Sequence, residues 1–505
     1  MIKTRSVSAI DNGVVIDHIP AGQALKIMRL LHVVNSKQRV TLGLNLRSTS
    51  LKLKDLIKIE NRLLTPQEID HVAIFAPGAT INRIVNFKVS EKINCELPKT
   101  IRDVLGILNS RGHQTRRNLF MIELENKQLI KLPGLIDPHV HFRTPGWEYK
   151  ENWETAAKAS IKGGYTTVFD MPNTIPPTVT EIALVEKKAL IDKQLKEAGI
   201  PLRYYLYFGA DKHHLNEIKK IKGQVIGIKV FMGCSTGGLV IDDDESLHAI
   251  FKIAAEENML VAVHAEDEQR LKENAKKFEG PQSYSIHSKI RDESAAILAV
   301  KKAIDLVRLY GTRLYILHVS THQEIDLIAQ AKKEGLPVFA ETTPHHLFLN
   351  SSDYQNLQGK AVMNPPLRSP EHQMALFSGI KSGIIDTIGS DHAPHTLEEK
   401  AKAYGDCPSG VPGIETTLPL LFEAYHQNLL SLDNIVNLTS RRAKTIFNLA
   451  DCPDDYVLVD LFLEKKVEDK RLRTKCQWSP FAGRLLRGWP VATVLKGHTY
   501  DLNKL

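Results

Sequence analysis

The stretch Asp137-Pro138-His139-Val140-His141-Phe142-Arg143 decides both the fold and the chemistry that we expect of this chain. It follows Lys131-Leu132-Pro133-Gly134-Leu135-Ile136, which has the pattern of a short buried strand entered through a proline and a glycine. Side chains on a strand alternate between faces, so His139 and His141 should point the same way. Two imidazoles on one face at a strand end are a candidate pair of metal ligands. The alternative is a polar strand end that binds no metal.

From residue 129 onward, apolar runs alternate with helical patterns, as in successive β/α units. The clearest helical patterns cover residues 182–196, 244–257, 295–310 and 324–334. Eight candidate strands end at His139/His141, Asn173, Gly209, Val230, His264, His318, Glu341 and Asp391. Eight such units predict an α/β fold of the (β/α)8 TIM-barrel type, in which chemistry gathers at the carboxyl ends of the strands.

Side chains that can bind metal fall at these predicted strand ends. They are His139, His141, Lys229, His264, His318 and Asp391. Four imidazoles and one carboxylate suit Zn²⁺. A protonated lysine cannot bind a cation, whereas a carbamate made from Lys229 and CO₂ would supply two oxygens that bridge two metal ions. We therefore expect two Zn²⁺ per chain, bridged by carboxylated Lys229. Taken singly, each residue has a plainer explanation, as a core histidine or a lysine reaching out of the barrel.

Seven short sequence motifs contain these ligands or lie between them. They are Gly134–Arg143, Met171–Thr174, Gly227–Gly233, Thr343–Leu347, Asn364–Arg368, Ser390–Thr396 and Gly413–Thr416. The ligand set, in its order along the chain, resembles that of the amidohydrolase superfamily, and the motifs resemble those of dihydroorotases. The resemblance implies a zinc-dependent enzyme that reversibly cyclises N-carbamoyl-L-aspartate to (S)-dihydroorotate in de novo pyrimidine biosynthesis.

The resemblance also assigns roles to individual residues. Asp391 would be both a metal ligand and the catalytic proton shuttle. The substrate contacts would be Arg143, Asn173, Asn364, His395, and the backbone at Ser409 and Gly410. Arg143 lies two positions past His141, and its guanidinium can fork onto the substrate carboxylate. Hydantoinases and allantoinases share the metal set but lack this arginine. The alternative is another cyclic-amide hydrolase, namely a dihydropyrimidinase, hydantoinase or allantoinase.

The first part of the chain has a different pattern. Strand patterns cover residues 7–10, 14–19, 39–46, 53–60 and 81–89, and helices are expected at 21–33 and from Thr65-Pro66 to about Phe75. Mixed elements of this kind predict an α+β domain with helices on one face of a mostly antiparallel sheet.

Four short sequence motifs in this part are similar to those of the nucleotide-binding domain of the aspartate carbamoyltransferase regulatory chain. They are Val14–Pro20, Gly43–Leu46, Lys54–Asn61 and Ala76–Ile84. The resemblance implies that residues 1–105 bind CTP and ATP as effectors through Asp17, His18, Lys58, Asn82 and Lys92. The alternative is that Asp17 and His18 only cap a turn and that the lysines are solvated.

The regulatory family continues into a four-cysteine zinc lobe that docks on the catalytic chain. Here Ile107 and Gly112 occupy the positions of the first two cysteine ligands, so a structural zinc site cannot form there. We therefore expect residues 106–128 to be a linker and residues 129–505 to be the dihydroorotase barrel. The aspartate carbamoyltransferase catalytic chain stays a candidate partner, and a non-catalytic scaffold for it is a further alternative. Both resembling families assemble, so we expect a homo-oligomer.

Composition narrows the class of protein. The 505 residues are 43% hydrophobic and 25% charged, as in a soluble globular protein, and no apolar run is long enough to cross a membrane. Five scattered cysteines indicate free thiols and a cytoplasmic location. The net charge is +8, and residues 1–100 hold 15 Lys+Arg against 8 Asp+Glu. This excess is either a solvated basic face or a site for an anion such as a nucleotide; nucleic acid is disfavoured because no aromatic residues interleave the basic ones.

Three further segments belong near the predicted barrel. Residues 234–238 are glycine-rich, and a turn beside the site is favoured over a phosphate loop because the P-loop lysine is absent. Residues 396–410 form a long irregular stretch that suits a substrate loop. Residues 456–505 contain short strand patterns at 457–460, 480–483 and 491–494, which predict a small β domain against the barrel.

Overall fold

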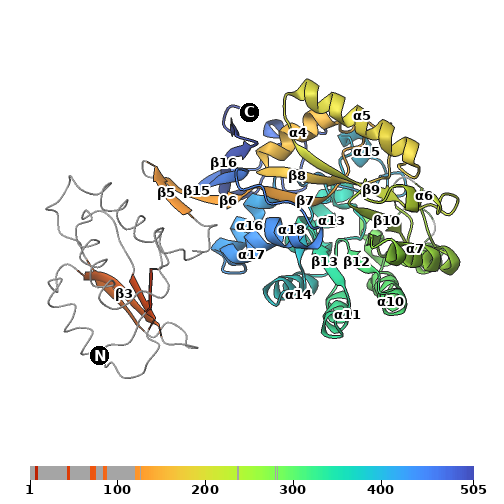
Figure 1. Ribbon diagram of the computed structural model, residues 1–505, viewed down its shortest axis with the longest axis horizontal. Coiled ribbons are helices and arrows are strands. Elements are labelled where there is room, and N and C mark those ends of the chain that lie inside the picture. The colour runs from red at the N-terminus through yellow and green to blue at the C-terminus, as the bar shows by residue number, and fades with distance from the viewer. Residues whose placement is uncertain are drawn as a thin grey trace. The chain divides into compact units, whose positions relative to one another are not determined.

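The computed structural model describes five strands in the first part of the chain and residues 127–505, except 236–237, 279 and 281 (Figure 1). The chain divides into two compact units, Met1–Glu123 and Leu124–Leu505. No helix among the described residues is long and apolar enough to span a membrane.

The described part of the first unit is a small sheet. Its strands are β1 (Ser6–Ala9), β2 (Leu42–Asn45), β3 (Ile69–Phe75) and β4 (Arg83–Phe87), in the order β1-β2-β3-β4. β1 pairs with β2 and β3 with β4 in antiparallel fashion, whereas β2 and β3 are parallel. The sheet is thus mostly antiparallel, as predicted. A further strand, β5 (Phe120–Leu124), contains the boundary between the units.

The predicted helix after Thr65-Pro66 is wrong over Ile69–Phe75, which is strand β3. β-Branched residues at Ile69, Val72 and Ile74 favour a pleated strand over a helix, and the helical start signal at Thr65-Pro66 outweighed them in the prediction. The predicted strands at 14–19 and 53–60 and the helix at 21–33 lie outside the described residues. So do all five predicted nucleotide contacts, Asp17, His18, Lys58, Asn82 and Lys92.

The second unit is built on eight parallel strands that follow one another in chain order around a barrel (Figure 1). They are β7 (Leu135–Val140), β8 (Tyr165–Asp170), β9 (Arg203–Gly209), β10 (Gly227–Phe231), β11 (Leu260–His264), β12 (Arg313–Ile316), β13 (Val338–Thr342) and β14 (Thr387–Ile388). A parallel bridge between Val140 and His392 joins the last strand end to the first, and the His141 amide donates to the His392 carbonyl at 2.8 Å. The predicted (β/α)8 barrel is confirmed.

Helices connect the strands and cover the outside of the barrel. The longer ones are α4 (Trp153–Lys162), α5 (Glu181–Ala198), α7 (Asp244–Glu256), α8 (Glu268–Ala275), α10 (Glu293–Tyr310), α11 (His322–Lys333), α14 (Pro370–Lys381) and α16 (Thr417–His426). The shorter ones are α6 (Glu217–Lys220), α9 (His287–Ile290), α12 (Pro344–Phe348), α13 (Tyr354–Leu357), α15 (Leu397–Lys400), α17 (Leu432–Val436) and α18 (Arg442–Ile446). All four predicted helical segments are helices. In α11 the predicted helix starts with a capping box, in which Thr321 and Glu324 exchange hydrogen bonds with the backbone.

Gly134 separates what the sequence suggested was one strand into two. β6 (Lys127–Pro133) lies in a small antiparallel sheet with β15 (Tyr456–Lys466), and β7 begins the barrel immediately afterwards. A Cβ at Gly134 would lie 2.3 Å from Thr166 Oγ1, so only glycine fits where the chain passes between the sheets.

The small sheet confirms the β segment predicted at the end of the chain. β15, β16 (Leu485–Leu495) and β17 (His498–Asp501) pair in succession. The strand predicted at residues 480–483 is wrong, because these residues form a turn in which Gly483 has a φ of 89°.

Candidate active site

One cavity opens at the carboxyl ends of the barrel strands, where the sequence placed the chemistry. The residues that line it include all the predicted metal ligands, namely His139, His141, Lys229, His264, His318 and Asp391. Five of the predicted substrate contacts also line it: Arg143, Asn173, Asn364, Ser409 and Gly410. Ser235, from the glycine-rich segment 234–238, is part of the lining as well.

The first group of donors comprises His139, His141 and Asp391, whose ligand atoms all lie within 4.8 Å of one another. Both histidines come from the end of β7 and turn Nε2 toward the same carboxylate, each at 3.3 Å from Asp391 Oδ1. Asp391 follows β14 with a φ of 45°, a conformation that is rare for a residue with a side chain. This strained backbone turns the carboxylate from the last strand toward the ligands of the first.

Each histidine of this group is held from behind through its other ring nitrogen. His139 Nδ1 lies 2.8 Å from Glu341 Oε1, and His141 Nδ1 lies 2.8 Å from Asn173 Oδ1. Glu341 Oε1 also accepts from the His318 amide at 3.3 Å, and Asn173 Oδ1 is an amide oxygen, so each Nδ1 donates and each Nε2 presents a lone pair to the cavity. Outer hydrogen bonds of this kind are typical of metal-binding histidines.

A second pair of donors faces the same cavity from β11 and β12. His264 Nδ1 and His318 Nε2 are 2.9 Å apart, and His264 Nε2 lies 2.9 Å from Glu266 Oε2. The Glu266 carboxylate fixes the proton of His264 on Nε2, so Nδ1 faces the cavity as a lone pair. His318, like Asp391, has a positive φ, here 41°.

Lys229 on β10 is 1% exposed, and burial lowers its pKa from 10.5 to about 7. Burial also lowers the pKa of His139 to about 3 and moves the pKa of His264 down. Near neutral pH these imidazoles are therefore uncharged, and Lys229 gives up its proton far more readily than a solvated lysine does. Uncharged imidazoles, a carboxylate and a readily deprotonated amine are a donor set that fits divalent metal ions.

Arg143 occupies the side of the cavity beside the first donor group. It is 2% exposed with a φ of 63°, and its Nε donates to the Pro394 carbonyl at 3.1 Å. Burial lowers its pKa only to about 10, so the guanidinium keeps its charge at neutral pH. Arg143 forms no ion pair with a carboxylate of the described residues, which leaves its charge available to an anionic ligand.

His395 is not among the residues that line the cavity; it lies behind Arg143. Its Nε2 is 3.1 Å from Arg143 Nη2 and 3.0 Å from the Ser409 carbonyl, and Lys150 Nζ lies 3.0 Å from Nδ1. Glu399 Oε2 lies 3.5 Å from the same Nδ1. In this arrangement His395 supports two cavity residues from behind.

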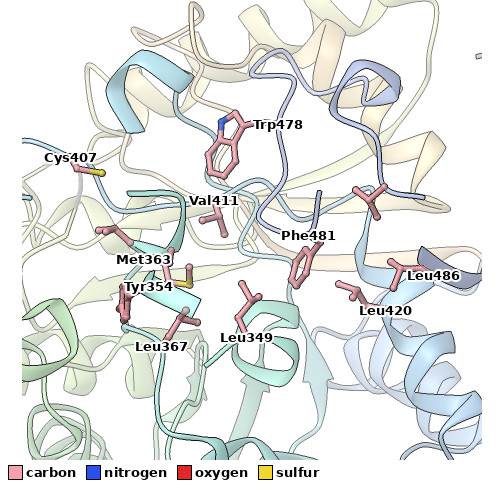
Figure 2. Packing of buried hydrophobic residues seen from close by; sticks show 13 residues of the cluster. Leu349, Tyr354, Met363, Leu367, Cys407, Val411, Leu420, Trp478, Phe481 and Leu486 are labelled. Atoms are coloured by element: carbon pink, nitrogen blue, oxygen red, sulfur yellow. The ribbon is translucent and has the colours of Figure 1, made fainter. Parts of the chain in front are cut away.

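A buried hydrophobic cluster adjoins Asn364 and Gly410 in the chain (Figure 2). Met363 and Val411, which are the chain neighbours of Asn364 and Gly410, pack in it with Trp478 and Phe481 from the segment before β16. Trp478 Nε1 also donates to the His395 carbonyl at 2.7 Å. The carboxyl-terminal segment thus holds part of the cavity wall in place.

Sequence reasoning missed the buried carboxylates behind the ligands. Glu341 and Glu266 hold imidazoles, and Asp137 Oδ1 accepts from the amides of Ser390 and His139 at 3.0 and 3.2 Å. The signal that could have found them is a carboxylate at the end of an apolar strand, where burial demands a partner.

Comparisons with known proteins agree with this geometry. Residues 130–452 match the model of the amidohydrolase family, and residues 5–96 match the allosteric domain of the aspartate carbamoyltransferase regulatory chain. A dihydroorotase of Halobacterium salinarum is 36% identical over 73% of this chain and 85% of its own length. A dihydroorotase of Methanosarcina acetivorans is 36% identical over 75% of this chain and 83% of its own length.

Solved structures of related enzymes share the fold. The L-hydantoinase (dihydropyrimidinase) of Arthrobacter aurescens is 29% identical, with a TM-score of 0.70, over 74% of this chain and 85% of its own. The dihydropyrimidinase of Brevibacillus agri is 29% identical, with a TM-score of 0.67, over the same shares of the two chains. The chain therefore belongs to the amidohydrolase family, as a dihydroorotase whose amino-terminal part matches the allosteric domain of the aspartate carbamoyltransferase regulatory chain.

Proposed function

We propose that this chain interconverts N-carbamoyl-L-aspartate and (S)-dihydroorotate with two Zn²⁺ ions bridged by carboxylated Lys229. The observation that carries the proposal is that one cavity holds the six ligand positions together with a buried arginine that has no carboxylate partner in the described structure. The six ligand positions suit metal-assisted amide hydrolysis, and the arginine selects an anionic substrate.

The metal ions would be held by two sets of residues that share Lys229. His139, His141 and Asp391 would form one set, and His264 with His318 the other. Bound there, Zn²⁺ would polarise an amide carbonyl and lower the pKa of a water molecule. Carboxylation of Lys229 joins its neutral amine nitrogen to CO₂ with loss of one proton, and the lowered pKa of about 7 supports it because the neutral amine is then well populated.

In the ring-opening direction a water molecule attacks the ring carbonyl, a C–O bond forms, and the C–N bond breaks. Asp391 would accept the proton of that water and deliver it to the departing ring nitrogen, since its carboxylate faces the cavity between the imidazoles. Cyclisation uses the same steps in reverse. Asn173 would contribute chiefly by holding His141, its partner at 2.8 Å.

Arg143 would bind the carboxylate that distinguishes dihydroorotate from hydantoins and dihydropyrimidines. Its guanidinium is charged, buried, and oriented by Pro394 and His395. Asn364 and the backbone of Ser409 and Gly410 would meet the ring amides, because all three line the same cavity. A hydantoinase or dihydropyrimidinase activity is the second candidate, favoured by the shared fold of the solved structures named above.

We propose that the chain has an effector-binding segment, a linker and an enzyme segment. Residues 1–105 would bind CTP or ATP through Asp17, His18, Lys58, Asn82 and Lys92, residues 106–128 would be a linker, and residues 129–505 would form the enzyme. The family match over residues 5–96 includes all five predicted contacts and supports this assignment. Isothermal calorimetry with CTP tests it, and no binding to the full chain would refute it. We also propose a homo-oligomer, with the aspartate carbamoyltransferase catalytic chain as a candidate partner.

Zinc titration tests the proposed enzyme directly. The full chain is stripped with a chelator, and ring opening of dihydroorotate is followed while Zn²⁺ is added back. The proposal predicts that activity appears with zinc and saturates at two ions per chain. Full activity in the stripped protein, or a failure of two bound ions to produce any, would contradict it.

A further inference from the structure

We propose that His287 is a positioning residue that fixes the side-chain amide of Asn364 with its Nδ2–H donors toward the cavity. His287 begins α9, is 6% exposed, and is not part of the cavity lining. It lies 77 positions before Asn364 in the chain and contacts it directly. The inference rests on the proposed function for the identity of the substrate, but the orientation of the amide rests on contacts alone.

The partners of His287 determine where its proton lies. Nε2 is 3.0 Å from the Met363 carbonyl oxygen and 2.9 Å from Asn364 Oδ1, while Nδ1 is 3.1 Å from the Tyr404 hydroxyl. A carbonyl oxygen can only accept, so Nε2 must carry the hydrogen and Nδ1 accepts from the tyrosine. Burial, with Arg291 nearby, lowers the pKa of His287 to about 4, so the ring is neutral under working conditions.

The protonated Nε2 in turn determines which end of the Asn364 amide faces it. An amide oxygen and an amide nitrogen have nearly the same shape, and only the hydrogen-bond network distinguishes them. With Nε2–H as donor, the facing atom must be Oδ1, because the flipped amide would set two N–H donors against each other. Nδ2 is therefore the end left for the cavity that Asn364 lines. Asn364 thus presents a donor, which selects ligands with a carbonyl oxygen at that point, as in a cyclic amide.

Tyr404 brings the 396–410 segment into this arrangement. Its hydroxyl and ring both contact His287, with ring centroids 5.6 Å apart in an edge-on geometry. Tyr284 supplies a matched control, because its hydroxyl donates at 2.6 Å to the Lys402 carbonyl of the same segment, not to His287.

The test compares two replacements of His287 in the zinc-loaded full chain. The His287→Gln side chain places an N–H donor near the position of Nε2, whereas the side chain in His287→Asn reaches only the position of Nδ1. We expect His287→Gln to keep KM for dihydroorotate within about threefold, and His287→Asn to raise it about tenfold or more, with a smaller change in kcat. Tyr404→Phe should raise KM more than Tyr284→Phe does.

A double-mutant cycle shows whether His287 acts through Asn364. In an Asn364→Ala background, His287→Asn should change KM by less than about twofold, because the amide that it orients is gone. Equal effects of His287→Asn with and without Asn364 would overturn the inference.

The ¹⁵N chemical shifts of His287 in the unmodified protein give a measurement that does not depend on activity. The Nε2–H tautomer is predicted, and the Nδ1–H tautomer would overturn the inference even if dihydroorotate proved not to be the substrate. A wild-type protein that shows the Nε2–H tautomer but does not open dihydroorotate would refute the proposed function alone.

Discussion

The cavity has two walls that are built differently. The metal wall consists of the six ligand positions, which are His139, His141, Lys229, His264, His318 and Asp391. The substrate wall consists of Arg143, Asn364, Ser409 and Gly410. Histidines of the metal wall donate hydrogen bonds to buried carboxyl oxygens behind them, such as those of Glu341 and Glu266. The substrate wall is backed by main-chain carbonyls and by the uncharged rings of His287 and His395.

The difference has an electrostatic reason. A carboxylate behind a metal-wall imidazole fixes its proton on the far nitrogen and strengthens the near nitrogen as a ligand. A carboxylate paired with Arg143 would instead neutralise the charge that an anionic substrate needs. Buried carboxyl groups therefore support histidines of the metal wall, whereas Arg143 of the substrate wall is held by a main-chain carbonyl. Removing one element of either wall at a time tests this difference.

Lys229→Ala should have the largest effect, because it removes the group proposed to bridge the two metal-binding sets. Activity should fall at least about 10³-fold, and bound zinc should fall below two ions per chain. A short carboxylic acid added to the variant should restore part of the activity by replacing the lost bridge. Activity measurements with zinc analysis check this result. A variant that keeps two zinc ions and near-normal activity would break the account of the metal wall.

Arg143→Met should impair only the substrate wall. We expect kcat/KM for dihydroorotate to fall about 10²-fold or more, since a desolvated charge pair with the carboxylate is lost. Zinc content should stay unchanged. Hydantoin, which has no carboxylate, serves as the comparison substrate, and its kcat/KM should change by less than about threefold. An equal loss for both substrates would show that Arg143 does not read the carboxylate.

Glu341→Gln should weaken the metal wall without abolishing it. The amide keeps the shape of the side chain but holds His139 Nδ1 less strongly than the carboxylate does at 2.8 Å. Zinc affinity should fall about 10–100-fold, measured by competition with a chelator. Glu334→Gln, at an exposed ion pair with Arg308 on the outside of the barrel, is the matched control and should not change it.

Lys400→Met should have the smallest effect, on the support of the substrate wall. Lys400 is 2% exposed, and its Nζ donates to the carbonyls of Val362 and Pro408 at 2.9 and 2.7 Å. Val362 and Pro408 lie just before Asn364 and Ser409 in the chain. We expect a rise of a few-fold in KM for dihydroorotate and a lower Tm, with exposed Lys402→Met as the control. Unchanged KM and Tm would show that this lysine holds neither segment.

The pH dependence of that effect has a definite sign. Burial lowers the pKa of Lys400 in the folded protein from 10.5 to about 7. Between these two values the unfolded chain binds more protons than the folded chain, so this group makes the wild-type protein more stable as pH rises from 7 toward 10.5. Methionine does not titrate, so the Tm difference in favour of wild type should be larger at pH 9 than at pH 7. A difference that shrinks with pH would contradict the lowered pKa.

The ligands of the metal wall could be predicted from the sequence, whereas the residues that support both walls could not. The ligand positions lie within or just after apolar barrel strands, and barrel geometry brings the ends of these strands together, so local patterns predicted residues such as His139 and Asp391. Glu341 lies 202 positions from His139 and His287 lies 77 from Asn364, and no local pattern pairs residues at such separations. Arg143 was placed on the face of His141 by strand alternation, yet the backbone turns there with a φ of 63°.

Elements with conflicting local signals were the ones predicted wrongly. Ile69–Phe75 followed a good helix start but has the β-branched residues of a strand, and pairing in the sheet prevails. Residues 480–483 contain apolar side chains, of which Phe481 is buried in the cluster of Figure 2, but the proline and glycine make a turn there. Burial alone therefore does not identify a strand.

The most direct test of the account is the ratio of kcat/KM for dihydroorotate to that for hydantoin, measured on the zinc-loaded wild-type chain. In the proposal, a metal wall for amide opening faces a substrate wall whose arginine forms no ion pair with a carboxylate of the described residues. This predicts a preference for dihydroorotate of at least about 10²-fold, the value of one desolvated charge pair. A ratio near one, or a preference for hydantoin, would contradict it and would favour a general cyclic-amide hydrolase.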